Sequence, residues 1–271
     1  MNNLRTVSPS SIIATRLFEL KNKISKTNNL SDEIESDFLS LIELAQGLDD
    51  YPSRSTTAES KELKNLNDET IVHDWNYAYK EKKSKSRLVT RMMSSHVSAQ
   101  FLKMLVSISK PKKILEIGLF SGYSALAMAE ALHDEGELIS CEVEPYAAKF
   151  AQKHFDKNKH GKKIKIKIGK ALDTLEKLKN EGHLFDFVFI DANKSEYPQY
   201  IETLIKNKLI NTNSLVCIDN VFLKGSTYSE YEKQSKSSKT VKKLNSELVN
   251  EQFFTVMVPL RDGITLMKLN N

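Results

Sequence analysis

The sequence predicts an α/β protein: a doubly wound, mostly parallel sheet of seven strands with helices on both faces, ending in an antiparallel hairpin and preceded by a helical extension. From residue 112, short β-prone runs alternate with helical stretches, a pattern typical of parallel sheets. Several of these runs end in a glycine or a carboxylate. In open α/β sheets, ligands bind at the carboxyl ends of the strands, so these residues are candidates for a site. The last two runs are separated by only a short turn, which favours a hairpin.

The composition is that of a folded chain with one substantial core. With 271 residues, of which 40% are hydrophobic, the chain can form one large domain or one domain with an appendage. No apolar run approaches the roughly 18 residues of a membrane span, and the N-terminus lacks the hydrophobic region of a signal peptide. Cys141 and Cys217 lie in predicted buried strands and make no disulfide framework. We therefore expect a cytoplasmic protein without a membrane partner.

The formal net charge of +5 is modest, and most lysines are interspersed with acidic residues. Local basic runs occur at 80–87, 162–170 and 233–243. Aromatic residues for base stacking are not interleaved with these runs, so solvated faces or loops are the favoured interpretation. We expect no nucleic-acid partner.

Residues 1–91 are predicted to form the helical extension, and residues 92–271 the domain that carries the site. Apolar residues at helical spacing predict a first helix after Pro9 and a second helix that Gly47 ends. The extension is expected either to wall a substrate pocket or to contact a second copy in a homodimer. Its remaining helices are expected after a polar connector over 48–60, near 63–66, 71–79 and 95–108.

The alternating part of the chain supplies the sheet. Helices are expected between its strands and before the hairpin, whose turn contains Arg261, Asp262 and Gly263. The predicted strands are 113–117, 137–143, 163–168, 185–190, 214–218, 253–258 and 263–268, and the predicted helices lie near 122–132, 145–155, 171–180, 195–207 and 236–250.

The segment 113–124 (KILEIGLFSGYS) predicts a strand that ends in a glycine turn and leads into a helix. It differs from the dinucleotide fingerprint G-x-G-x-x-G, because one glycine is missing from the turn around Gly118 and Glu116 lies at the strand end. A pyrophosphate avoids a nearby carboxylate, whereas the sulfonium of S-adenosylmethionine (SAM) tolerates one. The segment favours SAM over NAD, although a structural glycine turn fits as well. Ser124 can donate to the SAM carboxylate or cap the helix.

Glu142 ends the second predicted strand, about 20 residues beyond the glycines. An acidic side chain at this place can accept hydrogen bonds from both ribose hydroxyls of a nucleoside cofactor. A surface charge is the alternative. Residues 169–171 follow the third strand, where backbone contacts to adenine or an ordinary turn are expected.

Asp191, Asp219 and Asn220 follow two runs, FVFI and LVCI, that are too apolar for surface strands. Neighbouring strand ends would bring the two carboxylates and the amide together, and hard divalent cations prefer such oxygen ligands. Magnesium, manganese or calcium is favoured over zinc, because no Cys/His spacing of zinc type exists. Caps for the following helices are the alternative role.

Lys194 lies three residues after Asp191 and can reach the same place. Beside a dication and partly desolvated, it can serve as a general base, although an exposed lysine is the commoner case. The histidines show no catalytic triad pattern, and His96, near the predicted site, is interpreted as structural.

Five segments resemble, in order and spacing, the cation-dependent SAM O-methyltransferases of the catechol and caffeoyl-CoA type: ILEIGLFSGYSALAMAEAL, ISCEVEPYAAKFAQ, FDFVFIDANKSEYPQY, LVCIDNVFLKG and PLRDGITL. The resemblance runs from about Met92 to Leu269 and implies a Rossmann-like fold. SPSSIIATRL, AQGLDDYPSRSTTAESKEL and SSHVSAQFLKML extend the similarity to one subgroup, the mycosporine-pathway O-methyltransferases that make 4-deoxygadusol from its demethyl precursor.

The resemblance also implies roles for individual residues. Asp191, Asp219 and Asn220 would bind the metal, and Lys194 would be the catalytic base. Departures from the family pattern are Asn193 in place of an acid, Leu223 where plant caffeoyl-CoA enzymes carry tryptophan, and Lys170 where many relatives have an acid or proline. The residues that would line the SAM site are Ser94, Glu116, Gly118, Ser124, Glu142, Ala171 and Asp191.

The resulting hypothesis is methyl transfer from SAM to one of two adjacent hydroxyls of a small acceptor, chelated by a divalent ion while Lys194 takes the proton. The rivals are a nicotinamide dehydrogenase, a base-methylating enzyme acting on nucleic acid, and a partner-binding protein without catalysis. The second would be expected to show an Asn/Asp-Pro-Pro-aromatic run where this chain has DANK.

Overall fold

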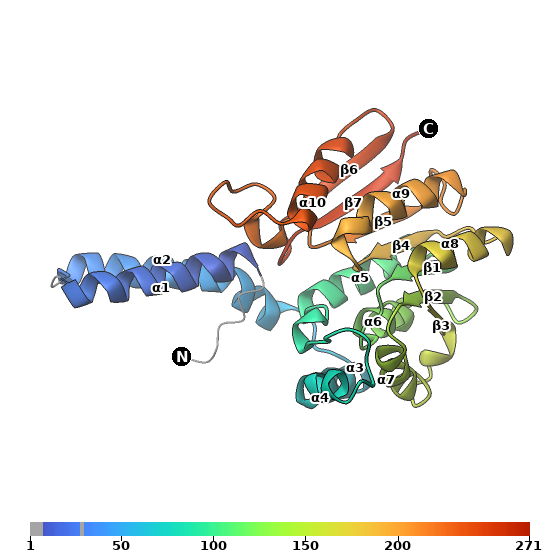
Figure 1. Cartoon of the computed structure of the whole chain (residues 1–271), viewed down its shortest axis with the longest axis horizontal. Coiled ribbons are helices and arrows are strands. Elements are labelled where there is room, and N and C mark those ends of the chain that lie inside the picture. The colour runs from blue at the N-terminus through green and yellow to red at the C-terminus, as the bar shows by residue number, and fades with distance from the viewer. Residues whose placement is uncertain (1–7, 28–29) are drawn as a thin grey trace.

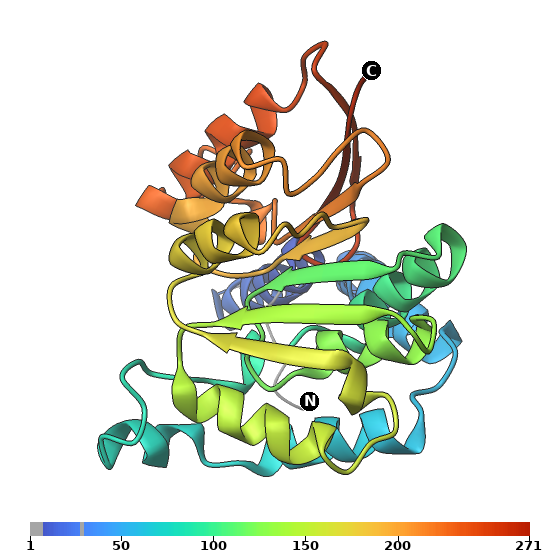
Figure 2. The same cartoon turned by 90° about the vertical axis from the view of Figure 1, so that its right-hand side faces the viewer.

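The computed structural model describes residues 8–27 and 30–271. Their strands form one sheet in the order β3-β2-β1-β4-β5-β7-β6, which Figure 2 shows between layers of helices. The first five strands are parallel, and β7 is antiparallel to β5 and β6. The predicted fold class is confirmed. The strands are β1 (Lys113–Ile117), β2 (Glu137–Glu142), β3 (Ile164–Ile168), β4 (Phe187–Ile190), β5 (Leu215–Asp219), β6 (Phe253–Val258) and β7 (Ile264–Leu269).

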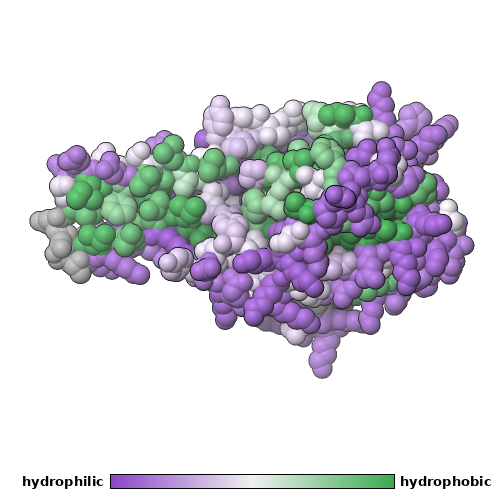
Figure 3. Space-filling model, turned by 90° about the horizontal axis from the view of Figure 1, so that it is seen from above, coloured by the Kyte–Doolittle hydropathy of each residue, from purple (hydrophilic) through white to green (hydrophobic). Residues whose placement is uncertain are grey.

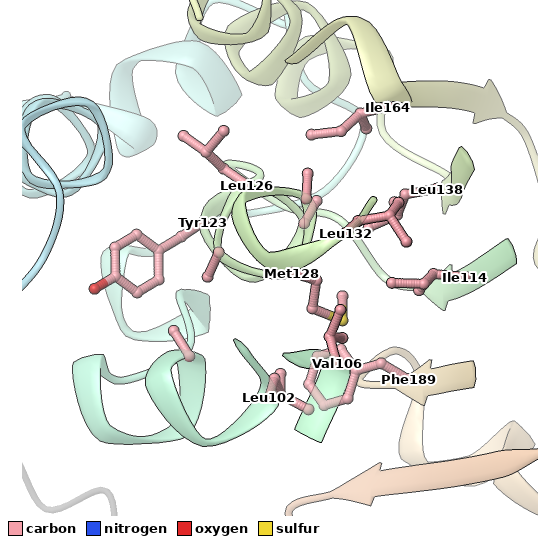
Figure 4. Packing of buried hydrophobic residues seen from close by; sticks show 14 of the residues in the cluster. Leu102, Val106, Ile114, Tyr123, Leu126, Met128, Leu132, Leu138, Ile164 and Phe189 are labelled. Atoms are coloured by element: carbon pink, nitrogen blue, oxygen red, sulfur yellow. The ribbon is translucent and has the colours of Figure 1, made fainter. Parts of the chain in front are cut away.

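Successive side chains of the central strands point to opposite faces, so each face of the sheet has its own core. Ile114 of β1 and Phe189 of β4 belong to the core with α5, α6 and α7, part of which Figure 4 shows. Leu115 and Ile190 belong to the other core, with α8, α9 and α10. These helices are α5 (His96–Ser109), α6 (Tyr123–Ala131), α7 (Pro145–Phe155), α8 (Ala171–Asn180), α9 (Tyr197–Lys206) and α10 (Lys236–Glu247).

Two long N-terminal helices, α1 (Pro9–Thr27) and α2 (Asp32–Ser55), pack side by side and extend from the body as an arm (Figure 1). α3 (Lys61–Val72) and α4 (Trp75–Lys80) return to the body. Leu63 and Leu66 of α3 are fully buried in the core beside α5 and α6. The predicted helical extension is therefore present, and α3 is part of the main core.

The prediction that Gly47 ends the second helix is wrong, because α2 continues to Ser55. The predicted connector over 48–60 is thus helical in its first part. One glycine costs a helix only about 1 kcal/mol, and Pro52 removes only the single helical bond that its own N–H would donate. Contacts from distant segments to Asp49 hold this end of the helix in place.

The predicted helix at 71–79 is also wrong at its start, since Ile71 and Val72 belong to α3. The chain breaks at His73 and Asp74, and the Asp74 carboxylate caps α4 by accepting from the Tyr77 amide at 2.9 Å. The alternation predicted from residue 112 onward is confirmed element by element.

Within the part of the chain that the structure describes, no helix is both long enough and apolar enough to cross a membrane. Cys141 and Cys217 are buried and not joined in a disulfide. Both lie in strands, as predicted.

Candidate active site

A cavity of about 1190 Å³ lies at the carboxyl ends of the parallel strands. Its walls come from the segments that follow all five parallel strands, together with the β6–β7 turn, the end of α2, part of α3 and the segment that leads into α5. Ligands of open α/β sheets bind at this edge. The cavity brings together Ser94, Gly118, Ser124, Glu142, Ala171, Asp191, Lys194, Asp219 and Asn220.

Gly118 is the point at which the turn after β1 crosses the end of β4. Its φ of +103° is a conformation that side chains rarely adopt, and a Cβ atom there would lie 2.2 Å from the Asp191 carbonyl oxygen. The Gly118 amide donates to the Cys141 carbonyl at 3.0 Å. Only glycine therefore lets the loop close over two neighbouring strands and leave the cavity open beside them.

Glu142 connects the end of β2 to the glycine turn. One carboxylate oxygen accepts from the amides of Leu119 at 3.2 Å and Phe120 at 2.7 Å. The other oxygen accepts from the Glu144 amide at 2.8 Å. Burial raises the pKa of Glu142 above its ordinary value, and these backbone bonds oppose the rise. The carboxylate also lines the cavity, so its remaining lone pairs can accept hydroxyl groups of a ligand.

Glu116 lies behind the cavity wall, in contrast to the other predicted cofactor residues. It is fully buried and accepts from the hydroxyls of Ser124 at 2.6 Å and Ser140 at 2.5 Å. Burial raises the pKa of Glu116 to about 8, although the two hydroxyls lower it. Ser124 lines the cavity, but its hydroxyl is directed to Glu116. The hydrogen bond between Glu116 and Ser124 thereby connects β1 to the start of α6, on either side of the glycine turn.

Ser94 and Ala171 contribute backbone-rich parts of the wall. Ser94 directly precedes Ser95, whose side chain caps α5 by accepting from the Ser98 amide at 3.1 Å. Ala171 is the first residue of α8 and follows Gly169 and Lys170, which also line the cavity. The first turns of α5 and α8 therefore both border the cavity.

The two acidic strand ends are neighbours. Ile190 of β4 pairs with Ile218 of β5, so Asp191 and Asp219 follow paired residues at one edge. Burial, and then the nearby charge of Asp191, raises the pKa of Asp219 to about 8. Asn220 has a left-handed backbone with φ +59°, which asparagine tolerates better than most residues. The backbone N–H of Asn220 donates to the Asp219 carboxylate at 2.7 Å.

Lys194 closes this cluster in the 3₁₀ turn η3 (Lys194–Glu196). Its Nζ donates to the Asp191 carboxylate at 2.6 Å. Burial lowers the pKa of Lys194, but the charge and hydrogen bond of Asp191, together with Tyr197 and Asp219, outweigh it, and the net pKa lies above the ordinary value. In this arrangement the lysine is an ammonium group that compensates one of the two carboxylates.

The donor set fits a hard divalent cation. Among the described residues, no group of three or more His, Cys, Asp or Glu side chains is arranged to hold a metal. Asp191, Asp219 and Asn220 instead offer two carboxylates and one amide, all oxygen donors of the kind that magnesium and calcium prefer. Burial and, after it, the charge of Asp191 raise the pKa of Asp219, and a bound cation would favour the ionised carboxylate.

Several residues in or next to the cavity were not singled out from the sequence. Tyr197 does not line the cavity but lies next to the cluster: it is fully buried, its hydroxyl donates to the Asp219 carbonyl at 3.1 Å, and its ring centroid lies 5.7 Å from the Lys194 Nζ. The run YPQY directly after DANKSE was the available signal. Asp49 and Arg261 do line the cavity, and they are distant in sequence from each other and from Asp191 and Asp219. His96, which the sequence placed near the site as a structural residue, lines the cavity as well, with Nδ1 buried and unpartnered among the described residues.

Comparison with known proteins assigns a chemistry to this arrangement. A family model described as O-methyltransferase matches residues 57–269. The probable caffeoyl-CoA O-methyltransferase 1 of Dictyostelium discoideum is 34% identical over 183 residues, which cover 66% of this chain and 79% of that protein. The catechol O-methyltransferase of Niastella koreensis is 38% identical over 132 residues, which cover 48% of this chain and 59% of that protein.

Solved structures have the same fold. The O-methyltransferase TomG from Streptomyces achromogenes, in complex with SAM, has a TM-score of 0.67 at 25% identity, covering 83% of this chain and 96% of that chain. The methyltransferase PaMTH1 of Podospora anserina, bound to SAH, has a TM-score of 0.70 at 24% identity, covering 90% and 99%.

Proposed function

The chain belongs to the O-methyltransferase family, and from this premise we propose that it transfers the methyl group of SAM to one hydroxyl of a small vicinal diol, enediol or catechol-like acceptor, with a divalent cation as cofactor. The observation that carries the proposal is the cluster of Asp191, Lys194, Asp219 and Asn220 on the wall of the cavity that Gly118 and Glu142 also line. The cluster joins an oxygen donor set to a lysine amine within reach of one ligand.

In the proposal, the half of the cavity around β1, β2 and β3 binds SAM. Glu142 accepts the ribose hydroxyls, the Ala171 region contacts the adenine, and Ser94 contacts the methionyl part. Gly118 leaves room for the cofactor, and the charge of Asp191 lies beside it. Glu116 and Ser124 act indirectly, by holding the turn. The SAM named in the TomG complex supports this assignment, since that protein covers 83% of this chain.

Asp191, Asp219 and Asn220 would hold the cation, with magnesium favoured over manganese or calcium. When bound, such an ion lowers the pKa of a hydroxyl that it coordinates. Lys194 can accept a proton at Nζ only when it is not held as an ammonium by Asp191. Lys194 could therefore act as a base only if the Asp191 carboxylate were bound to another positive group, such as the cation. The acceptor oxygen then bonds to the SAM methyl carbon while the carbon–sulfur bond breaks, and S-adenosylhomocysteine leaves.

Metal removal tests the cation requirement. The purified protein is treated with EDTA, gel-filtered and assayed for methyl transfer to catechol, with and without added magnesium. We expect activity to be lost by EDTA, restored by magnesium, and absent in Asp219→Ala under both conditions. Full activity after EDTA, or a wild-type rate in Asp219→Ala, would contradict a cation held by these residues.

The acceptor within this class is proposed from the N-terminal resemblance. We infer demethyl-4-deoxygadusol as the first candidate, with caffeoyl-CoA-like and other phenolic acceptors as the alternative that the Dictyostelium relative's name supports. A parallel assay of demethyl-4-deoxygadusol, catechol and caffeoyl-CoA, each with SAM and magnesium, ranks them by kcat/KM. A preference for caffeoyl-CoA would overturn the first candidate and leave the O-methyltransferase proposal standing.

We also propose a homodimer, in which residues 1–91 serve both the acceptor pocket and the subunit contact and residues 92–271 carry the cofactor. Support comes from apolar side chains along the arm, which Figure 3 shows in green. Leu44, Leu48 and Tyr51 are 68%, 69% and 67% exposed. Clusters of exposed apolar residues of this kind mark interaction surfaces.

A further inference from the structure

An ion pair joins the N-terminal arm to the far end of the sheet. The Arg261 guanidinium lies 3.0 Å from the Asp49 carboxylate, and the two side chains are only 24% and 11% exposed. Arg261 belongs to the β6–β7 turn and Asp49 to the last part of α2. Both residues line the cavity. We call this pair the latch.

The Arg261 side of the latch is held rigidly. Arg261 has a left-handed backbone with φ +55°, which is unusual for a residue other than glycine. The next residue, Asp262, accepts from the Lys224 amide at 2.6 Å through its carboxylate, and its carbonyl accepts from the Phe222 amide at 2.9 Å. The turn is thereby fixed to the segment that follows Asn220. Strained backbone held by its surroundings is common at functional sites.

The Asp49 side is held by the start of α1. The Ser8 hydroxyl donates to the carboxylate oxygen of Asp49 that Arg261 does not contact, and the Ser10 hydroxyl donates to the same oxygen at 3.2 Å. Asp49 therefore connects both helices of the arm to the β6–β7 turn. Asp50 and Ser53, which follow it in α2, also line the cavity.

The strand order locates the latch relative to the two halves of the cavity. Gly118 and Gly169 follow β1 and β3, and Glu142 ends β2, all on one side of the sheet centre. Asp191 and Asp219 mark the ends of β4 and β5, and the β6–β7 turn lies one strand further. The latch thus lies beyond the Asp191–Asp219 cluster, on the side away from the proposed SAM half. This is the side left for the acceptor.

We propose that the Asp49–Arg261 latch fixes the acceptor wall of the cavity and determines which acceptors the enzyme accepts. This inference rests on the proposed function. Because Asp49 neutralises the guanidinium, the latch itself adds no net positive charge to the wall, and the pair suits uncharged hydroxylated acceptors over those that would need Arg261 to bind a carboxylate. Asp49 and Arg261 are positioning residues, since they act through the shape and charge of the wall.

The first experiment measures acceptor selectivity. Asp49→Asn leaves Arg261 without its anionic partner, so we expect the ratio of kcat/KM for 3,4-dihydroxybenzoate to that for catechol to rise about tenfold, the scale of a single charge contact. Arg261→Gln should raise the KM for catechol. Arg261→Lys keeps the charge, so its KM for catechol should lie between those of wild type and Arg261→Gln. The KM for SAM should change in none of them. An unchanged selectivity ratio in Asp49→Asn would overturn the inference.

Arg16→Gln is the matched control. Arg16 of α1 pairs with Glu232 at 2.6 Å, so it also ties the arm to the body, but neither residue lines the cavity. We expect this variant to keep the wild-type selectivity ratio. The same change in Arg16→Gln as in Asp49→Asn would show that arm attachment in general, and not the latch, controls the acceptor.

A second experiment tests the latch without turnover, and the wild-type methylation assay beside it tests the proposed function. Hydrogen exchange of α1 and of the end of α2 should be faster in Asp49→Asn and in Arg261→Gln than in wild type and Arg16→Gln. SAM binding is followed by fluorescence of Trp75, the single tryptophan, whose ring centroid lies 4.6 Å from that of the cavity residue Phe120. Wild-type protein that binds SAM but methylates no diol would contradict the proposed function, whereas equal exchange in all four proteins would contradict the latch.

Discussion

At the scale of single residues, burial sets the charge state of the carboxylates near the strand ends. Glu116 and Asp219 both have a pKa raised to about 8, chiefly by burial. The causes then differ, because Glu116 is held by two serine hydroxyls inside the protein whereas Asp219 lines a cavity beside a second carboxylate. The Glu116 carboxyl group has its hydrogen-bond partners within the protein, whereas the Asp191–Asp219 pair faces a cavity in which a cation can bind.

The protonation of Glu116 predicts a pH-dependent contribution to stability. Its pKa is about 8 in the folded protein against an ordinary 4.5, so its contribution is fully present below about pH 4.5 and is lost as pH rises through 8. Glu116→Gln cannot ionise. Its free energy of unfolding should therefore improve relative to wild type by up to about 1.4 kcal/mol per pH unit between pH 5 and 8. Urea denaturation of both proteins at pH 5.5 and 7.5 measures this, and a pH-independent difference would refute it.

Which residues were predictable depended on where their partners lie in the sequence. Clear apolar runs precede the residues of the proposed metal and catalytic cluster, and the structure brings these residues to one cavity: Asp191, Lys194, Asp219 and Asn220. The position of Glu116 was not predictable, because its partner Ser140 is the residue paired with it on the neighbouring strand β2. That register depends on the sheet and not on any local motif.

At the scale of elements, the parallel strands could be predicted closely and the arm less so. Strands buried on both faces are continuous apolar runs, and their helices begin and end at local signals. The end of α2 depends instead on Asp49, whose partners Ser10 and Arg261 come from opposite ends of the chain. No local pattern contains that information.

The glycine turn gives a prediction at this scale. In Gly118→Ala the new methyl group would meet the Asp191 carbonyl oxygen at 2.2 Å, and neither backbone can yield without moving a strand end. We expect a loss of about 2–4 kcal/mol in the free energy of unfolding, with weakened SAM binding. Gly182→Ala is the control, because Gly182 also has a positive φ (+73°) but has open space around it, so it should lose only about 1 kcal/mol. Equal losses in the two variants would show that the crossing at Gly118 is not tight.

At the scale of the whole molecule, the arm and the methyltransferase body meet at the cavity. α3 already belongs to the main core, so α1 and α2 form the part that extends away (Figure 1). At one end of this arm, Asp49, Asp50 and Ser53 line the cavity. Along the rest of the arm, apolar side chains are exposed. The extension was predicted either to wall the pocket or to contact a second copy, and its contact with a second copy stays a prediction.

The proposed dimer predicts the effect of charges on the arm. Leu44→Glu with Leu48→Glu should convert a dimer to a monomer in sedimentation velocity, because burying two carboxylates without partners is strongly unfavourable. Val249→Glu is the control, since Val249 is 77% exposed and lies beyond α10. A wild-type protein that sediments as a monomer, or a double variant that remains a dimer, would rule out this surface as the contact.

The most direct test of the central claim is transfer of a labelled methyl group from SAM to catechol, measured with magnesium at saturating SAM in wild type, Lys194→Met and Lys206→Met. Lys206 ends α9 and does not line the cavity. We predict transfer by wild type and Lys206→Met, and a loss of at least about 100-fold in Lys194→Met with SAM still bound, the scale of a lost general base. A wild-type rate in Lys194→Met, or no transfer by the wild-type protein to any vicinal diol, would contradict the account.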